Sequence, residues 1–221
     1  MTSVEWVTLT LLLIGAIAGV WKYEQLPQDG QYLTYFFILT FILEVNADYY
    51  MSVFRRNNLF LYHTFIPFQY VALALFLREN TFSKTIKKWA IGSIILVLIT
   101  AALFSGFVQN LKEMPFYSLI ITRILLLFGA LLYLKQLINS KETEVLSRIP
   151  AFWVASGMLI YFISFFQMGL MRYLIINDHK LANFWIYIVL WFDVGFYLLC
   201  LFPLLKFWRG NWPAINERNI T

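Results

Sequence analysis

Residues 89–108 read WAIGSIILVLITAALFSGFV, a run of 20 residues without a charged side chain. The hydrocarbon core of a bilayer needs about 20 mostly apolar residues for each spanning helix, so this stretch predicts a transmembrane helix. Six more stretches of similar character lie on either side of it, at about 4–21, 31–54, 58–77, 116–138, 150–175 and 184–208. We therefore predict an all-α polytopic membrane protein, a seven-transmembrane-helix bundle that forms a single domain over residues 1–221.

The composition of the whole chain agrees with a membrane environment. Of its 221 residues, 61% are hydrophobic and only 13% are charged, whereas soluble proteins carry about 25% charged residues. The connections between the apolar stretches are short, and the single cysteine, Cys200, excludes an intrachain disulfide. We expect the lipid bilayer as the solvent of the chain, and we expect neither a cofactor nor a nucleic-acid partner.

The first apolar stretch has the features of a retained helix rather than of a cleaved signal peptide. Glu5 stands where a basic region would be expected, and the stretch ends in an aromatic and basic segment at 21–23 instead of small residues. Gly15 and Gly19 are four residues apart, so they share one helix face. Small residues on one face allow another helix to pack closely, and we expect such a contact here.

The distribution of Lys and Arg predicts which way the helices run. With the N-terminus outside, 11 of the 17 basic residues fall on the cytoplasmic side and five on the outer side, which leaves Arg123 within the membrane. By the positive-inside rule this asymmetry predicts an outer N-terminus and a cytoplasmic C-terminus. The single glycosylation sequon, at 219–221, would then lie inside. Together with the short loops, this placement favours a bacterial inner (plasma) membrane.

Several strongly polar residues fall within the predicted helices, where such groups are costly and usually face the bundle interior, a partner or water. Glu44 and Asp48 are four residues apart, so they lie one turn apart on a single face. In the predicted topology, these two and the polar groups of four other helices fall in the outer half of the membrane. The candidate ligand-binding residues are Glu44, Asp48, Tyr62, His63, Arg123, Gln167 and Asp193.

Three interpretations fit this group of residues. Arg123 could form buried ion pairs with Glu44 or Asp193 that join helices, or the same residues could line a ligand pocket open to the outer side. If the helix ends are misplaced, Asp48 and His63 lie in water instead. A metal held by Glu44, Asp48 and His63 is a further option, because carboxylate and imidazole ligands suit several divalent ions, although no sequence motif supports it.

Known chemistries of seven-helix membrane proteins are not matched by the sequence. A retinal Schiff base needs a lysine near the middle of the last helix, but the lysine found there, Lys206, lies at the cytoplasmic end. Zinc hydrolases of the ceramidase and adiponectin-receptor type need several histidines, and this chain has two, His63 and His179. The sequence also lacks GxSxG, Walker and GxGxxG motifs.

The polar residues within the predicted helices lie mainly in the outer half of the membrane. This placement favours a binding or sensing module, a receptor-like bundle for a small charged or amphipathic ligand from the outer side. Because only about a dozen residues follow the last helix, we expect any signal to pass to a partner protein in the membrane. A small-solute transport protein built from three, one and three helices is the alternative, and an intramembrane enzyme is a further one. No residue pattern fixes a catalytic group, so we do not expect an enzyme.

Overall fold

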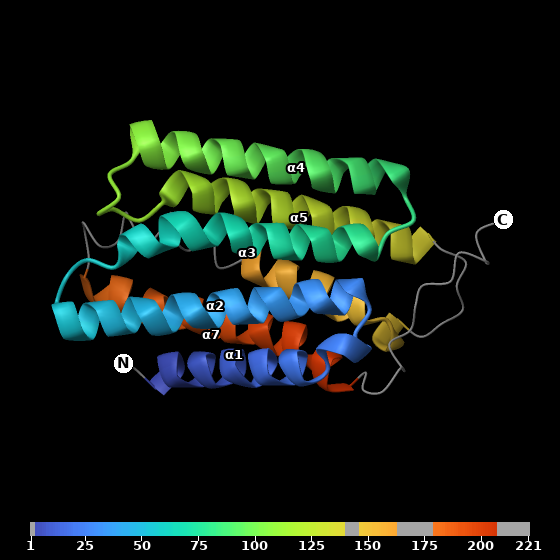
Figure 1. Ribbon diagram of the computed structural model, residues 1–221, viewed down its shortest axis with the longest axis horizontal. Helices are drawn as coiled ribbons and strands as arrows, with labels where there is room; N and C mark the ends of the chain where they lie inside the picture. Colours follow the sequence, from blue (N-terminus) through green and yellow to red (C-terminus); the bar gives the residue numbers. More distant parts are fainter. Residues whose placement is uncertain (1–2, 140–145, 163–178, 207–221) are drawn as a thin grey trace.

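The computed structural model describes residues 3–139, 146–162 and 179–206, and within these residues the fold is entirely helical (Figure 1). The long helices are α1 (Ser3–Trp21), α2 (Gln28–Phe54), α3 (Leu59–Glu79), α4 (Lys84–Leu103), α5 (Phe116–Asn139), the helix Pro150–Phe162 and α7 (His179–Lys206). Two short 3-10 turns, η1 (Tyr23–Gln25) and η3 (Leu146–Arg148), and a π-helical turn, η2 (Phe104–Val108), complete the described secondary structure.

Six of the described helices are long and apolar enough to cross a membrane. They are α1, α2, α3, α4 continued through η2, α5 and the portion of α7 over Tyr187–Lys206. The predicted all-helical, membrane-type architecture is therefore confirmed. The stretch predicted over 150–175 is described as the helix Pro150–Phe162, which is shorter than a membrane span. Its predicted continuation lies outside the described residues, so the count of seven stays a prediction.

Three helices begin earlier than their hydropathy predicts, and the last of them, α7, begins at His179 rather than near residue 184. The second begins at Gln28 rather than near residue 31, directly after the extended residue Pro27. The fourth begins at Lys84 rather than near residue 89, and the Ser83 hydroxyl caps it by accepting a hydrogen bond from the Ile86 N–H (3.4 Å). Hydropathy misses these first turns because their side chains are polar, although their backbone is already helical.

The helices pack side by side, with α3 near the centre of the bundle (Figure 1). It contacts α2 on one side and α4 and α5 on the other, while α1 packs against both α2 and α7. At the outer edge, α4 exposes Ile95, Ile99 and other large apolar side chains, and Phe107 of η2 is 86% exposed. Such a surface suits contact with lipid rather than with water.

The first two helices approach each other closely at two glycines. A Cβ atom added to Gly15 would lie 2.3 Å from the Phe37 ring, and one added to Gly19 would lie 2.5 Å from the Thr34 side chain. Both glycines are buried, which confirms the predicted close-packing face. The Phe37 ring is itself fully buried in the core of the bundle, so it has little room to move.

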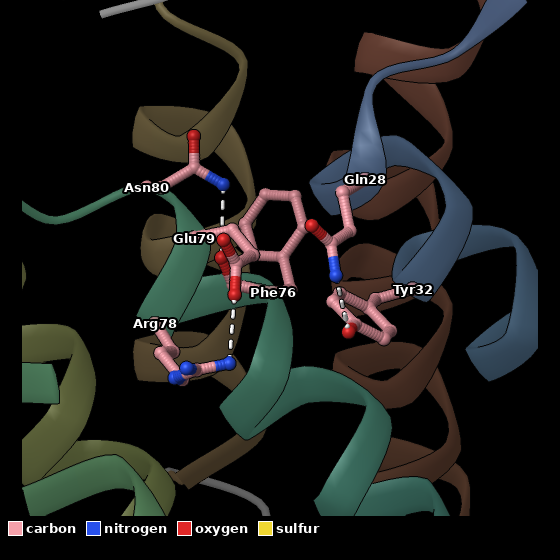
Figure 2. Close-up of polar contacts among 6 residues, drawn as sticks. All are labelled: Gln28, Tyr32, Phe76, Arg78, Glu79 and Asn80. Atoms are coloured by element: carbon pink, nitrogen blue, oxygen red, sulfur yellow. Dashed lines mark hydrogen bonds and ion pairs between the residues drawn. The ribbon is translucent and has the colours of Figure 1, made fainter. Parts of the chain in front are cut away.

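Polar contacts gather at the end of the bundle opposite the N-terminus. Figure 2 shows three of them between residues close in sequence, Gln28 with Tyr32, Asn80 with Phe76 and Arg78 with Glu79. The Asn80 side chain follows α3 and donates through Nδ2 to the Phe76 carbonyl (2.9 Å) and to Asp29 Oδ2 at the start of α2 (3.0 Å). At the same end, buried Lys22 donates to the Leu204 carbonyl (2.5 Å) in the last turn of α7, and burial lowers the pKa of its ammonium group. Helices α2, α3 and α7 are thereby fixed at one end.

The contact between α1 and α2 makes a direct prediction about stability. Replacing Gly15→Ala should lower the free energy of unfolding by about 1–3 kcal/mol, because the added methyl group overlaps the Phe37 ring. The matched control is Gly92→Ala in α4, where no atom lies within 4 Å of the added Cβ, and which should be neutral or stabilising. Thermal unfolding of the purified protein in detergent measures both. Equal effects of the two substitutions would contradict the packing.

Candidate functional site

A cavity of about 390 Å³ lies between α1, α2, α3 and α7. Its lining residues come from the start of α1, the last turns of α2, the start of α3 and the middle of α7. Figure 1 shows the start of α1, the end of α2 and the start of α3 at one end of the bundle. Its volume falls in the range of pockets that hold small molecules. The residues that line it are Glu5, Thr8, Leu9, Glu44, Ala47, Asp48, Met51, Asn58, Tyr62, Leu190, Asp193 and Tyr197.

One face of α2 forms a long wall of the cavity. Glu44, Ala47, Asp48 and Met51 line it, and their spacing of three or four residues places them on one face of an α-helix. Ala47 is buried, and its small side chain leaves room between the two carboxylates that flank it. The helix ends at Arg55, whose left-handed backbone (φ 49°) reverses the chain toward α3.

The start of α3 is tied to this wall by two hydrogen bonds. Asn58, at the N-terminal boundary of α3, donates through Nδ2 to the Ala47 carbonyl (3.0 Å). The Tyr62 hydroxyl, one turn further on, donates to Glu44 Oε2 (3.3 Å). Both bonds join residues that line the cavity, so they set the width of the space between α2 and α3 and hold the Glu44 carboxylate in place.

Helices α1 and α7 supply the remaining wall. Glu5, Thr8 and Leu9 come from the first turns of α1, and Asp193 and Tyr197 come from the middle of α7. Glu5 was not among the predicted site residues. The predicted topology could have identified it, because a carboxylate near the outer start of the first helix lies at about the depth of Glu44.

The lining of the cavity is strongly acidic. Within the described part of the chain, Glu5, Glu44, Asp48 and Asp193 contribute four carboxylates to the lining, and no described Lys, Arg or His lines it. The charges of Glu5 and Asp193 are close enough to act on the Glu44 carboxylate. The side chains of Arg55 and Arg56 are exposed at the same end of the bundle, but they do not line the cavity. A space with this lining attracts cations and repels anions.

One hydroxyl group in the cavity wall is available to a ligand. Among the described residues, the buried Thr8 Oγ1 has no hydrogen-bond partner. Buried polar groups normally have a partner, so this hydroxyl is positioned to bond to a molecule in the cavity. Tyr197, which is only 7% exposed, adds an aromatic ring to the same wall.

The structure gathers four of the seven predicted site residues in this cavity: Glu44, Asp48, Tyr62 and Asp193. Gln167 lies outside the described residues. His63 and Arg123 are both buried but do not line the cavity. The carboxylates come from three helices, and among the described residues no three His, Cys, Asp or Glu side chains come close enough together to hold a metal ion.

His63 faces away from the cavity and joins α3 to the loop before α5. Its Nε2 donates to the Glu113 carbonyl (2.9 Å), which leaves Nδ1 to accept from the Ser105 hydroxyl (2.8 Å). Both ring nitrogens are therefore engaged, and the hypothesis of a metal held with Glu44 does not fit this arrangement. Consecutive helical residues point about 100° apart, so His63 faces α4 while its neighbour Tyr62 faces α2.

Arg123 is buried in α5 and contacts the helix Pro150–Phe162. It donates through a guanidinium NH group to the Tyr161 carbonyl (3.3 Å), and its guanidinium carbon lies 3.9 Å from the centroid of the Tyr161 ring. The Tyr161 ring stacks in turn on Phe196, with centroids 4.4 Å apart. Phe196 is the sequence neighbour of Tyr197, which lines the cavity. Arg123 therefore lies behind the wall that Tyr197 forms and does not itself line the cavity.

No protein-family model, curated protein or solved structure matches the chain. The function therefore has to be inferred from the chemistry of the cavity itself.

Proposed function

We propose that the chain is an integral membrane binding and sensing module whose cavity takes a small organic cation. The observation that carries this function is the acidic lining, in which the described residues contribute four carboxylates and no basic side chain. From the sequence we expected a charged or amphipathic ligand, and the lining favours a positive charge on it. Carboxylates are costly near the membrane interior, and a cation bound beside them would lower that cost.

The other lining residues favour an amine with a short apolar part. Leu9, Met51 and Leu190 add apolar surface beside the carboxylates, and alkyl groups gain free energy by covering such surface. The rings of Tyr62 and Tyr197 also line the cavity, and aromatic faces attract ammonium groups. This mixture suits an alkylamine better than a bare, strongly hydrated ion.

The packing beneath the cavity supports a binding site rather than a transport path. Leu12, Phe37 and Leu43 are fully or almost fully buried toward the opposite end of the bundle. Gln69, a polar residue that might have continued the path, donates to the Thr40 hydroxyl (3.0 Å). A ligand from the cavity side would meet this packed layer, so we propose that binding is relayed to a partner protein in the membrane.

We also propose seven spanning helices, with the cavity facing the outside of a bacterial inner membrane. Continuation of the helix Pro150–Phe162 toward residue 175 would supply the seventh span. Exposed Lys84, Lys88 and Lys135 lie at the end of the bundle opposite the cavity, which suits the cytoplasmic side. In this orientation the cavity samples ligands from outside the cell.

This orientation predicts the accessibility of introduced cysteines. The native Cys200 is buried, so it should give little background labelling. In intact cells, a membrane-impermeant maleimide should label Arg56→Cys, between α2 and α3. It should label Glu24→Cys, at the opposite end of α2, only after the membrane is opened. The reverse pattern would invert the topology and place the cavity on the cytoplasmic side.

The cation site predicts binding that depends on one carboxylate. Short alkylamines with one or two ammonium groups should bind saturably to the protein in phosphatidylcholine nanodiscs, and butyrate should not, as measured by titration calorimetry. Glu44→Gln should weaken amine binding about tenfold or more, because a charge-assisted hydrogen bond is lost. It retains an acceptor for the Tyr62 hydroxyl, so the fold should persist.

The matched control is Glu24→Gln, which makes the same substitution at an exposed residue far from the cavity. It should leave amine binding unchanged. Butyrate binding as tight as that of the amines, or an unchanged affinity in Glu44→Gln, would contradict a cation site. Amine uptake into proteoliposomes that is lost in Glu44→Gln would favour the transporter over the binding module.

A further inference from the structure

We infer that two loops at one end of the bundle form a docking surface for an anionic phospholipid. The surface consists of the loop between α2 and α3, with Arg55 and Arg56, the loop between η2 and α5, with Lys112, and the aromatic side chains beside both loops. The inference goes beyond the proposed function, because it depends neither on a ligand of the cavity nor on the side of the membrane that the surface faces.

Two hydrogen bonds fix the positions of these loops. The Asn57 side chain in the first loop donates through Nδ2 to the Lys112 carbonyl in the second (2.5 Å). His63, in the first turns of α3, donates through Nε2 to the Glu113 carbonyl (2.9 Å). Figure 1 shows both loops at the same end of the bundle. Residues that are far apart in the sequence are therefore held together in one surface.

Aromatic side chains gather beside both loops. Next to the first loop, the Tyr50 ring contacts the rings of Phe54 and Phe60, with centroids 5.2 and 5.3 Å apart. Next to the second loop, the rings of Phe104 and Tyr117 have their centroids 5.3 Å apart. Phe54, Phe60 and Tyr117 are exposed. Aromatic side chains of membrane proteins are enriched at the level of the lipid headgroups, so these rings indicate that both loops lie at that level.

The loops themselves carry exposed basic side chains. Arg55, Arg56 and Lys112 are exposed, and among the described residues none of the three forms an ion pair. Glu113 is the only acidic residue in the stretches 55–58 and 109–115, so these stretches have a net charge of +2. A surface of this charge favours a lipid with a net negative charge over phosphatidylcholine, whose choline group balances the charge of its phosphate.

An anionic phospholipid offers a partner for both parts of the surface. A guanidinium group can donate to two oxygens of one phosphate, and two arginines follow each other in the first loop. The acyl chains can cover the exposed apolar side chains that precede the second loop, Phe107 and Val108. A soluble phosphate would match the charges alone and leave these apolar side chains uncovered, so the surface fits a lipid better.

The test measures which lipid lies beside the second loop. Leu111→Cys introduces a labelling site at an exposed residue, and the buried native Cys200 should not react. A bimane label at this site is quenched by lipids that carry a spin label near the headgroup. In phosphatidylcholine nanodiscs, spin-labelled phosphatidylglycerol should quench about fivefold more than the same fraction of spin-labelled phosphatidylcholine, because one basic residue near an anionic surface contributes about fivefold in affinity.

The preference should depend on the charge of the two arginines. When Arg55→Gln and Arg56→Gln are combined, the two lipids should quench about equally, because Glu113 balances the remaining charge of Lys112. Arg55→Lys combined with Arg56→Lys keeps the charge and should keep the preference. The matched control combines Lys84→Gln and Lys88→Gln, which remove the same charge from exposed residues at the opposite end of the bundle, and it should also keep the preference.

Three results would overturn the inference. The first is equal quenching by the two lipids when both arginines are present. The second is a preference that survives the paired glutamine substitutions in a protein with normal thermal unfolding. The third is quenching by neither lipid, which would mean that protein covers the surface, either a second copy of this chain or another partner. If the glutamine variant does not fold, about 1 M salt replaces it, since salt screens exposed charges. A preference that persists in such salt would overturn the inference as well.

Discussion

The electrostatic cost of placing carboxylates at the end of an apolar bundle dominates the chemistry of this protein. Four carboxylates line one cavity, while the core beneath them consists of residues such as Leu12, Phe37 and Phe196. Charges in such surroundings persist only where water, counter-ions or hydrogen bonds compensate them. The donation from Tyr62 to Glu44 meets part of that requirement, and the proposed cationic ligand would meet more of it.

Sequence analysis predicted that several polar residues of different helices lie at one level of the bundle. Runs of about 20 apolar residues locate a spanning helix, and the position of a side chain along the run gives its depth. Glu44, Asp48, Tyr62 and Asp193 were predicted at similar depth, and the structure places all of them around one cavity. Glu44 and Asp48 were also placed on one face, because the helical period relates residues within the same helix.

Sequence analysis did not predict how each helix is rotated about its axis. That rotation depends on contacts between helices, such as the close approach of Phe37 to Gly15, where a Cβ atom would not fit. His63 lies at the same depth as Tyr62 but faces Ser105 instead of the cavity, and Arg123 faces Tyr161. Because the helices are apolar on all sides, their hydropathy pattern does not indicate which side chains face the bundle interior. The orientations of His63 and Arg123 were therefore known only from the structure.

The most direct test is an experimental structure of the protein in nanodiscs with a short alkylamine. Density for the amine between α1, α2 and α7, beside the carboxylate of Glu44, is the expected result. Carboxylates that point toward lipid on different sides of the bundle would contradict the account. So would a cavity that stays without amine density because its carboxylates are sealed in ion pairs with Arg123.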